Sequence, residues 1–543
     1  MVKPGSIAAQ LNEAVALHRR GAIGPAAQIY QSIIDRDPRN ADAYQLLGVV
    51  ARQMGKRDLA LHLLVTALEF NPHHAAALAN HAVLLRESGD LPQARVQAEA
   101  AVRANPKYAE AHIALGGVLQ AMHAWEDARR HYQTAARLQP DNPALLNDMA
   151  LVERRLGHLS AAYTAAMQGL RLAPAMPELH NTRGQILRAA GYPDAACSAF
   201  AAAAAHDPGL ADAGINEALA CLLIGDFARG WELFAQRGKI DPRVAHVPAW
   251  DGRTDPQCVL LVQAEQGLGD AVQFARLLPW AAARVARVVL EVPTPLRELM
   301  TSSFPDIDVM TPEDQLPSGV TRRCRLLDLA GYVPLIDDEI PGVAPYLRVA
   351  ETPLPELLAS CAAPRVGLVW AGNPGHLNDA NRSLRLAQFA DICAPMAGHM
   401  VSLQKVPQIG ELAASGLKIV DAAPLLHDFA ATAALLQHID LVVTVDTSVA
   451  HLAGALGRPV WIMLPFDPDW RWQLERHDVP WYPTAKLYRQ PAPGAWADVL
   501  AAVGRDLARF ADGDRSVLAP GVWKVPLPRR QLQGAAVLPD FTE

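Results

Sequence analysis

The sequence lacks a long apolar run, the feature that would mark a membrane-spanning helix. No stretch approaches roughly 18 consecutive apolar residues, a length at which a span is considered. The first residues, MVKPGSIAAQLNEAVALHRRG, also lack the apolar core of a secretory signal. We therefore expect a cytoplasmic protein with no transmembrane segment.

Cysteine is scarce, and so is an excess of charge of one sign. The six cysteines are scattered, with no Cys-x-x-Cys pair and no histidine at metal-binding spacing, so we interpret them as reduced structural residues. The formal net charge is only −7, which gives no general reason to bind nucleic acid or an anionic membrane.

The composition that remains is that of an ordinary globular protein, with 51% hydrophobic and 19% charged residues over 543 positions. A chain of this length exceeds what one hydrophobic core supports, so we expect more than one domain.

Proline recurs at a fixed interval of 34 residues in the first half of the chain. Twelve residues before each of the first six prolines stands an alanine, and Gly230 takes that place in the seventh repeat. Seventeen residues before the proline, six of the seven positions are glycine and the other is His123. The prolines are Pro38, Pro72, Pro106, Pro140, Pro174, Pro208 and Pro242.

Each recurring residue has a structural reason. Glycine allows a tight, often left-handed turn between two helices, alanine lets the helices approach closely, and proline begins the next connection. The intervening segments are rich in alanine and leucine at helical spacing. Residues 6–242 resemble the tetratricopeptide repeat family, which implies about seven helical hairpins stacked into an α-solenoid. Such an array serves as a rigid scaffold or dimerisation surface, or as a groove that presents a polypeptide to the neighbouring module.

The second half changes its period, after a junction rich in proline and turn residues at 243–257. Short apolar runs alternate with helical stretches, which predicts α/β domains with parallel sheets. We expect two Rossmann-like halves at 258–350 and 365–511, and a strap or loose tail without catalytic duty at 512–543. The expected strands are 259–263, 288–292, 366–370, 400–404, 440–445 and 460–464.

The first candidate site is QAEQGLGD (263–270), between a strand and a helix. Strand, glycine turn and helix form the geometry by which a substrate approaches the backbone of an open α/β sheet. Asp270 stands where the chain enters the helix and is our candidate catalytic residue. The alternative is that Asp270 is only a helix N-cap that accepts from N–H groups two or three residues on.

The second candidate site is DTSVAHLA (446–453), after another expected strand. Thr447 and His451 are four residues apart and share a helix face, while the helix start offers N–H groups and a positive dipole to an anion. The alternative is a capped helix with a histidine packed in the core. A Ser-His-Asp hydrolase triad does not fit, because three residues within six positions cannot form the spatial relay.

A third set follows the carboxyl ends of two more strands: Trp370 to Asn373, then His376, Asn378 and Arg382, with Lys405 further on. Arg382 and Lys405 are candidates to neutralise a diphosphate, the alternative being surface charges. We interpret Asp467-Pro468-Asp469 as turn chemistry rather than a metal motif. Packing at the core or at the lip of a cleft is the favoured interpretation of Trp470, Trp472 and Trp481.

With these motifs identified, residues 259–490 resemble the ADP-heptose:lipopolysaccharide heptosyltransferase family, which has the two-Rossmann glycosyltransferase-B fold. The proposed general base of that family falls on Asp270, in Gly269-Asp270. Its Asp-Thr-x-x-x-His donor motif falls on 446–451, and its basic residue after the first strand of the second domain matches Arg382.

The resemblance implies a metal-independent, inverting transfer of a sugar from a nucleotide-sugar co-substrate, with no other cofactor. Repeats followed by such a module are similar in outline to the protein O-linked N-acetylglucosamine transferases, which implies a protein acceptor. The alternatives are a glycan acceptor, or a non-catalytic scaffold with a degenerate module. The expected donor-binding residues are Gly267, Gly269, Asn373, Arg382, Lys405, Asp446, Thr447, Ser448 and His451. Sugar, nucleotide and oligomeric state are left open by the pattern.

Overall fold

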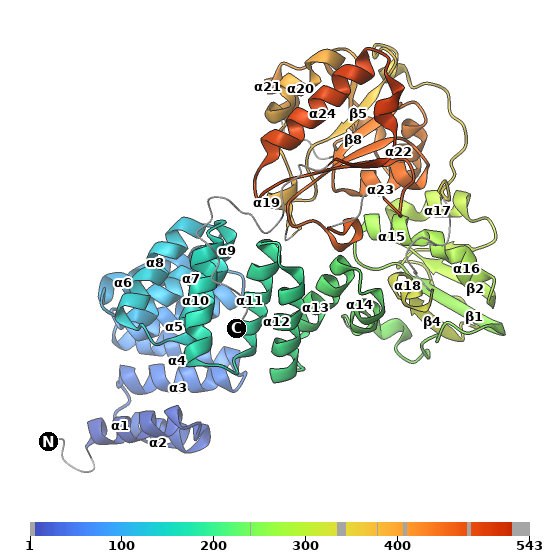
Figure 1. The fold of residues 1–543 in the computed structure, drawn as a ribbon. Coiled ribbons are helices and arrows are strands. Elements are labelled where there is room, and N and C mark those ends of the chain that lie inside the picture. The colour runs from blue at the N-terminus through green and yellow to red at the C-terminus, as the bar shows by residue number, and fades with distance from the viewer. Residues whose placement is uncertain are drawn as a thin grey trace. The chain divides into compact units, whose positions relative to one another are not determined.

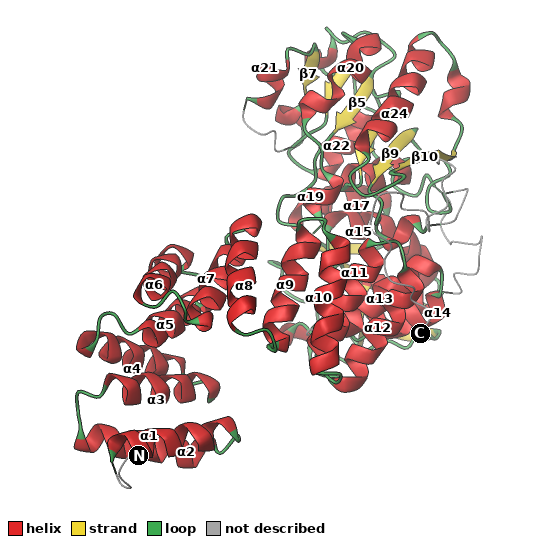
Figure 2. Cartoon of the chain, turned by 60° about the vertical axis from the view of Figure 1, so that its left-hand side comes forward, coloured by secondary structure: helices red, strands yellow, loops and turns green. Residues whose placement is uncertain are grey.

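The computed structural model describes residues 6–238, 240–333, 344–376, 378–405, 410–474 and 479–523. Contacts divide these residues into two units, one that ends at Ile186 and one that begins at Leu187. The division falls within helix α11 (Pro177–Ala189). All strands of the described residues belong to the second unit (Figures 1 and 2).

The first unit is a series of helical hairpins, as the 34-residue period predicts. Helices of 13 and 14 residues alternate, and each pair is offset from the previous one by 34 positions. Its helices are α1 (Ile7–Arg19), α2 (Ile23–Arg36), α3 (Ala41–Gln53), α4 (Arg57–Phe70), α5 (Ala75–Glu87), α6 (Leu91–Ala104), α7 (Ala109–Ala121), α8 (Trp125–Leu138), α9 (Pro143–Arg155), α10 (Leu159–Leu172) and the start of α11.

The recurring residues have the structural roles expected of them. The glycines of the hairpin turns have positive φ, and His123, which replaces one of them, has φ of 60°. The alanines that precede the prolines, from Ala26 to Ala196, are fully buried. Close helix packing explains why a larger side chain is excluded there.

The second unit begins with the last helices of the repeat pattern. These are α12 (Pro193–His206), α13 (Ala211–Ile224) and α14 (Phe227–Phe234). Helix α13 packs against the short helix η9 (Trp470–Trp472), and α14 packs against α18 (Leu329–Tyr332). By contact, these last three helices belong with the α/β part of the chain.

A four-stranded parallel sheet has the order β3-β2-β1-β4. Its strands are β1 (Asp255–Gln263), β2 (Val285–Glu291), β3 (Asp308–Met310) and β4 (Arg322–Arg325). Helices α15 (Leu268–Phe274), α16 (Leu278–Ala282), α17 (Arg297–Ser303) and α18 lie in the connections or follow the last strand. Strand β1 starts within the expected junction and ends at the first candidate site.

A seven-stranded parallel sheet has the order β11-β10-β9-β8-β5-β6-β7. Its strands are β5 (Val366–Val369), β6 (Met400–Ser402), β7 (Ile419–Asp421), β8 (Leu441–Val445), β9 (Val460–Leu464), β10 (Ala485–Arg489) and β11 (Gly521–Trp523). The accompanying helices are α19 (Asp379–Arg382), α20 (Ala390–Cys393), α21 (Glu411–Ser415), α22 (Phe429–Leu436), α23 (Ser448–Ala455) and α24 (Trp496–Ala511). Strand β11 comes from the expected tail and pairs with β10, so this part of the tail is an edge strand. The rest of the tail lies outside the described residues.

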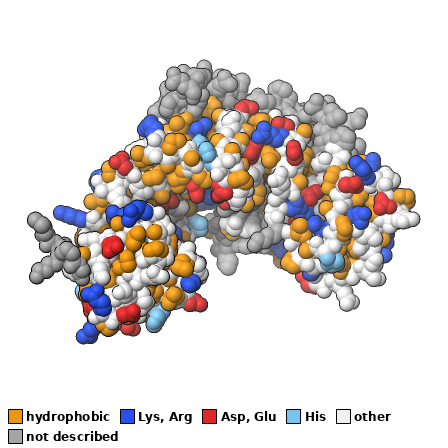
Figure 3. Space-filling model, turned by 90° about the horizontal axis from the view of Figure 1, so that it is seen from below, with side chains coloured by type: hydrophobic (Ala, Val, Ile, Leu, Met, Phe, Trp, Pro, Cys, Tyr) orange, Lys and Arg blue, Asp and Glu red, His pale blue; other side chains and the backbone are white. Residues whose placement is uncertain are grey.

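The described surface and helices agree with the composition. On the face in Figure 3, acidic and basic side chains are interspersed with apolar ones, as the modest net charge indicates. No helix among the described residues combines the length and apolar character that a membrane span requires.

Candidate functional site

Asp270 lies in the first turn of α15, directly after strand β1. The N-cap of the helix is Gly267, and the Asp270 Oδ2 atom accepts a hydrogen bond from its backbone N–H at 2.7 Å. Asp270 is therefore not itself the N-cap, although its carboxylate ties the turn to the helix. The side chain is 22% exposed, which leaves part of the carboxylate open to a ligand.

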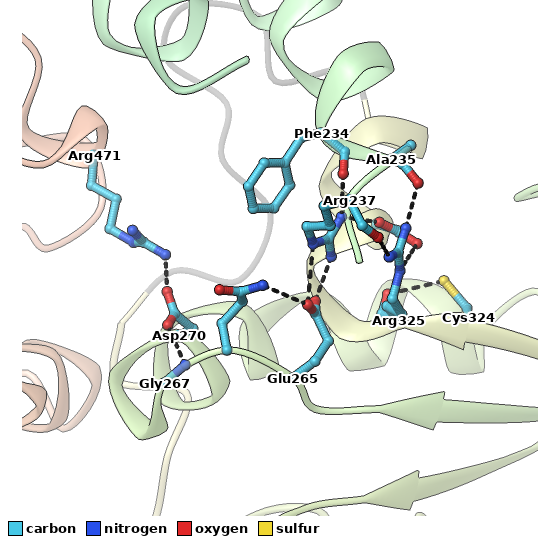
Figure 4. A network of polar contacts seen from close by, with 11 residues as sticks. Phe234, Ala235, Arg237, Glu265, Gly267, Asp270, Cys324, Arg325 and Arg471 are labelled. Carbon is cyan, nitrogen blue, oxygen red and sulfur yellow. Dashed lines mark hydrogen bonds and ion pairs between the residues drawn. The ribbon is translucent and has the colours of Figure 1, made fainter. Parts of the chain in front are cut away.

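The other Asp270 oxygen faces Arg471, a residue that sequence reasoning missed. Arg471 lies in η9, its side chain is only 8% exposed, and its Nη2 donates to Asp270 Oδ1 (Figure 4). Its Nη1 donates to Asp469 Oδ1 at 2.8 Å, and its Nε donates to Gln273 Oε1. The contact joins residues 201 positions apart, so no local pattern reveals it.

Burial and charge act on the Asp270 carboxyl in opposite directions. Burial raises its pKa and Arg471 lowers it, with a net rise above the ordinary aspartate value. A carboxylate with a raised pKa is better suited to accept a proton near neutral pH. The arrangement is therefore able to support general-base chemistry.

Helix α23 begins immediately after strand β8 at the second candidate site. Thr447 is its N-cap, and among the described residues no side chain accepts from the first N–H groups of the helix; the Thr447 hydroxyl instead contacts that of Thr444 at 3.1 Å. Asp446, one of the expected donor-binding residues, directly precedes this N-cap. The N–H groups at Ser448 and beyond face no capping side chain, which is the arrangement that accepts an anion.

His451 is a buried histidine with one edge toward the candidate site. Its Nδ1 lies 2.9 Å from the Tyr482 hydroxyl, and its ring stacks on Trp472 with centroids 5.6 Å apart. Burial lowers the pKa of His451 to about 3, so the ring is neutral at physiological pH. Its Nε2 lies 3.9 Å from Asp446 Oδ1. The histidine thus packs in the core, as the alternative held, and still borders the site.

Gly269 brings the two candidate sites together. A β-carbon at this position would lie 2.9 Å from His451 Cδ2 and 3.4 Å from the Ser448 α-carbon. Helix α15 packs against α23 at this point. Asp270 and the start of α23, more than 170 positions apart in the sequence, therefore belong to one site between the two sheets.

Arg382 supplies positive charge beside Asp446. Its Nη1 donates to the Asp446 carbonyl at 2.9 Å, and its Nε donates to Asp379 Oδ1 at 3.3 Å. The guanidinium lies over Gly372, where a β-carbon would come within 2.6 Å of it. Burial, and then the charge of Asp469, raise the pKa of Asp446 to about 6. Arg382 thus lies beside the second candidate site.

Two other expected residues have different surroundings. Lys405 Nζ donates to the His427 carbonyl at 3.1 Å, and Asn373 Oδ1 accepts from the Gly375 N–H at 2.9 Å within a turn. Both side chains are exposed. Neither side chain makes a hydrogen bond to another predicted site residue within the described ranges.

The tryptophans and the Asp-Pro-Asp segment have structural roles. Trp470, Trp472 and Trp481 are buried, which confirms the interpretation as packing residues. Asp467 pairs with Arg188 at 3.2 Å, and Asp469 pairs with Arg471. In the described part of the chain, no group of three or more His, Cys, Asp or Glu side chains is arranged to hold a metal ion.

Comparison with protein families gives two matches. Residues 407–463 match glycosyltransferase family 9 (heptosyltransferase), a segment that contains the start of α23. Residues 46–109 and 80–143 match tetratricopeptide repeats.

One relative aligns with most of the chain. Protein FlbA of Caulobacter vibrioides is 24% identical over 525 residues, which cover 90% of this chain and 87% of that protein. Two others match only a part. The mouse protein O-mannosyl-transferase TMTC1 is 28% identical over 25% of this chain and 15% of its own length. The Arabidopsis thaliana protein SPINDLY, a probable UDP-N-acetylglucosamine–peptide N-acetylglucosaminyltransferase, is 28% identical over 20% of this chain and 12% of its own length.

Among solved structures, a thermophilic tetratricopeptide protein of Thermus thermophilus is 25% identical and covers 34% of this chain. All of that protein is covered, with a TM-score of 0.31.

By the family matches, the chain combines tetratricopeptide repeats with a C-terminal α/β segment that matches glycosyltransferase family 9, the heptosyltransferase family.

Proposed function

We propose that the chain is a glycosyltransferase that moves a sugar from a nucleotide-sugar donor to an acceptor hydroxyl. The family match supports glycosyltransfer in general. The observation that carries the finer proposal is the close approach at Gly269, which unites the Asp270 carboxylate with the uncapped start of α23. One side of the site accepts a proton and the other accepts an anion, which are the two requirements of this reaction.

Asp270 is the general base of the proposed reaction. It removes the proton from the acceptor hydroxyl as that oxygen attacks the anomeric carbon, on the face opposite the leaving diphosphate. The raised pKa of Asp270 favours this role, because a base works best when its pKa lies near the operating pH.

The departing nucleoside diphosphate is held at the start of α23. The N–H groups around Thr447 and Ser448 and the positive end of the helix stabilise the developing charge. Arg382, which already touches the backbone of Asp446, adds a full positive charge. These groups stabilise the leaving group without a metal ion, and Asp446 and the Nε2 edge of His451 bind sugar hydroxyls.

A protein acceptor is the part of the proposal that rests on the repeats. Tetratricopeptide arrays present concave surfaces to polypeptides, and one relative is named as a probable peptide glycosyltransferase. We propose that the array holds the acceptor protein. The rival is a repeat scaffold whose α/β module binds no donor.

A binding screen separates the two. Thermal shift and calorimetry of the purified protein against UDP, GDP, ADP and their sugars, with chelator present, should reveal one saturable nucleotide. Arg382→Gln should weaken this binding by about tenfold or more, since a hydrogen bond to a charged group contributes roughly 1.5–3 kcal/mol. Arg385→Gln, an exposed arginine three residues on, is the matched control.

The catalytic arm uses Asp270→Asn. This variant should bind the same nucleotide with little change in affinity and lose transfer by orders of magnitude. Unchanged turnover would remove Asp270 from the mechanism. If none of the nucleotides or their sugars binds to the wild-type protein, the scaffold function is correct instead.

A further inference from the structure

Arg471 connects the two α/β halves at the candidate base. Asp270 belongs to the half built on β1 to β4, whereas Arg471 follows β9 in the other half. The guanidinium reaches Asp270, Asp469 and Gln273 at once, and it lies over the Trp470 ring at 4.6 Å. A side chain this buried, with a partner for each of its nitrogens, is fixed in one orientation.

The surroundings of this pair carry an excess of negative charge. Glu265 lies near Asp270, and Asp446 lies near Arg471. The charge of Arg382 lies close enough to interact electrostatically with Asp446, His376 and His451. The titratable and charged groups that face the pair are Glu265, His376, Arg382, Asp446, His451 and Asp469.

Arg471 is the cation in direct contact with Asp270 and Asp469, whereas Glu265 pairs with Arg237. Without it, Asp270 and Asp469 would face each other as like charges in a site with little solvent, and one of them would gain a proton. A protonated Asp270 is unable to act as a base. The ionised form of Asp270 thus depends on a residue supplied by the opposite half.

We propose that Arg471 is a positioning residue of the transfer reaction: it holds Asp270 ionised and oriented, and does so only while the two α/β halves are in contact. This inference rests on the proposed function of the site. It makes the base depend on a residue supplied by the half that carries the start of α23.

The proton balance of the step agrees with this role. The acceptor O–H bond breaks and its proton moves to Asp270, while the acceptor oxygen forms the bond to the anomeric carbon. The bond from that carbon to the diphosphate oxygen breaks, and its electron pair leaves with the nucleotide. Asp270 becomes neutral, and Arg471 retains Asp469 as its ion-pair partner, so the cation is not left unpaired.

The test is the pH dependence of kcat/KM, measured with the donor found in the binding screen. Removing the guanidinium should raise the pKa of Asp270, because an opposite charge at this range lowers a carboxyl pKa by about 1–3 units. Arg471→Gln should therefore shift the acid limb, the part of the profile where kcat/KM falls as Asp270 becomes protonated, to a pH about 1 unit or more higher. At pH values below the limb, this shift reduces kcat/KM about tenfold. Arg471→Lys, which keeps the charge, should restore the limb in part.

Arg276→Gln is the matched control. Arg276 is also buried and also joins the two halves, through a hydrogen bond from Nη1 to the Trp481 carbonyl at 2.7 Å. Its described hydrogen bond goes to that carbonyl rather than to Asp270. The substitution should lower stability without moving the acid limb. An unchanged limb in Arg471→Gln, or an equal shift in Arg276→Gln, would overturn the proposal.

A double-mutant cycle of unfolding stability tests the coupling between Arg471 and Asp270 without an activity assay. In urea unfolding at pH 7, Arg471→Gln should lower the midpoint less in the Asp270→Asn background than in the wild type. Additive effects would show that the two groups are not coupled and would overturn the proposal. If the wild type binds donor but the limb does not move, only the role of Arg471 fails. If coupling is present but no donor binds, the proposed function fails, and with it the role of Arg471 in transfer.

Discussion

Replacing Arg237 should be among the most damaging single changes in the second unit. Arg237 follows α14, is 3% exposed, and pairs with both Glu265 and Asp328. Its guanidinium also lies 4.0 Å from the centre of the Phe234 ring. Arg325 completes the network by donating to the carbonyls of Ala235 and Arg237 (Figure 4). The arginine thereby ties the last repeat helix to the segment that leads into Asp270.

The magnitude follows from what Arg237→Ala leaves behind. Breaking a buried ion pair by removing one partner costs about 3–5 kcal/mol, because the remaining charge is uncompensated. Glu265 and Asp328 keep 21% and 16% of their side chains exposed, so water recovers part of this cost. We therefore expect destabilisation near the lower end, about 3 kcal/mol.

Urea unfolding followed by tryptophan fluorescence measures this change. The control is Arg287→Ala, which removes an exposed ion pair with Asp308 in the same half, with side chains 48% and 55% exposed. It should cost less than about 1 kcal/mol. Adding Glu265→Gln and Asp328→Asn to Arg237→Ala should restore part of the loss. A loss in Arg237→Ala no larger than in Arg287→Ala would refute the reasoning.

Three further substitutions test other parts of the structure. Gly269→Ala should destabilise the protein by about 1–3 kcal/mol through overpacking against His451. The control is Gly214→Ala, on an open helix surface, which should be neutral or stabilising by up to about 1 kcal/mol. Equal unfolding midpoints for the two variants would contradict the close approach at Gly269. Burial raises the pKa of Asp148 to about 6, so the folded state binds an extra proton between about pH 4 and 6 and loses stability as pH rises through that window. Asp148→Asn should therefore be more stable than the wild type at pH 7, and the difference in stability should disappear below pH 4. A difference in melting temperature that stays constant across this pH range would disprove the raised pKa of Asp148. Trp470→Ala should cost about 3–5 kcal/mol because three aromatic rings pack around it, and Trp470→Phe should cost less; chemical denaturation of both variants checks the order.

The repeats were predictable because their signals are local. A glycine turn, a small residue and a proline each act within a few positions, so a period of 34 residues specifies the hairpins. The one exception, His123, still adopts the left-handed conformation, because neighbouring helix packing determines that turn as strongly as the residue does.

The sheets were predictable only where a strand is an uninterrupted apolar run. Strands β3, β7 and β11 have three residues each and no longer apolar run marks them, whereas the equally short β6 begins the apolar run at 400–404. Strand β4 has the sequence Arg-Arg-Cys-Arg, a composition that gives no strand signal. Such a charged strand is tolerated because β4 lies at the edge of its sheet and pairs only with β1.

The candidate site shows the same limit. Asp270 and the start of α23 follow apolar strands and could be found from the sequence. Arg471 could not, because a buried arginine is recognised by partners on distant segments, and Asp270 is 201 positions away. Lys405 had the same sequence context as the others, yet its hydrogen bond goes to His427.

Helices α13 and α14 continue the repeat pattern but share their core with the α/β part, through Trp231, Phe274 and Trp470. Dissection of the protein should respect this shared core. A fragment cut at residue 243 would expose an aromatic surface and should aggregate, whereas one that begins ahead of α12 keeps that surface covered. Exchange of repeats should accordingly be tolerated toward the N-terminal end of the array and resisted in α13 and α14.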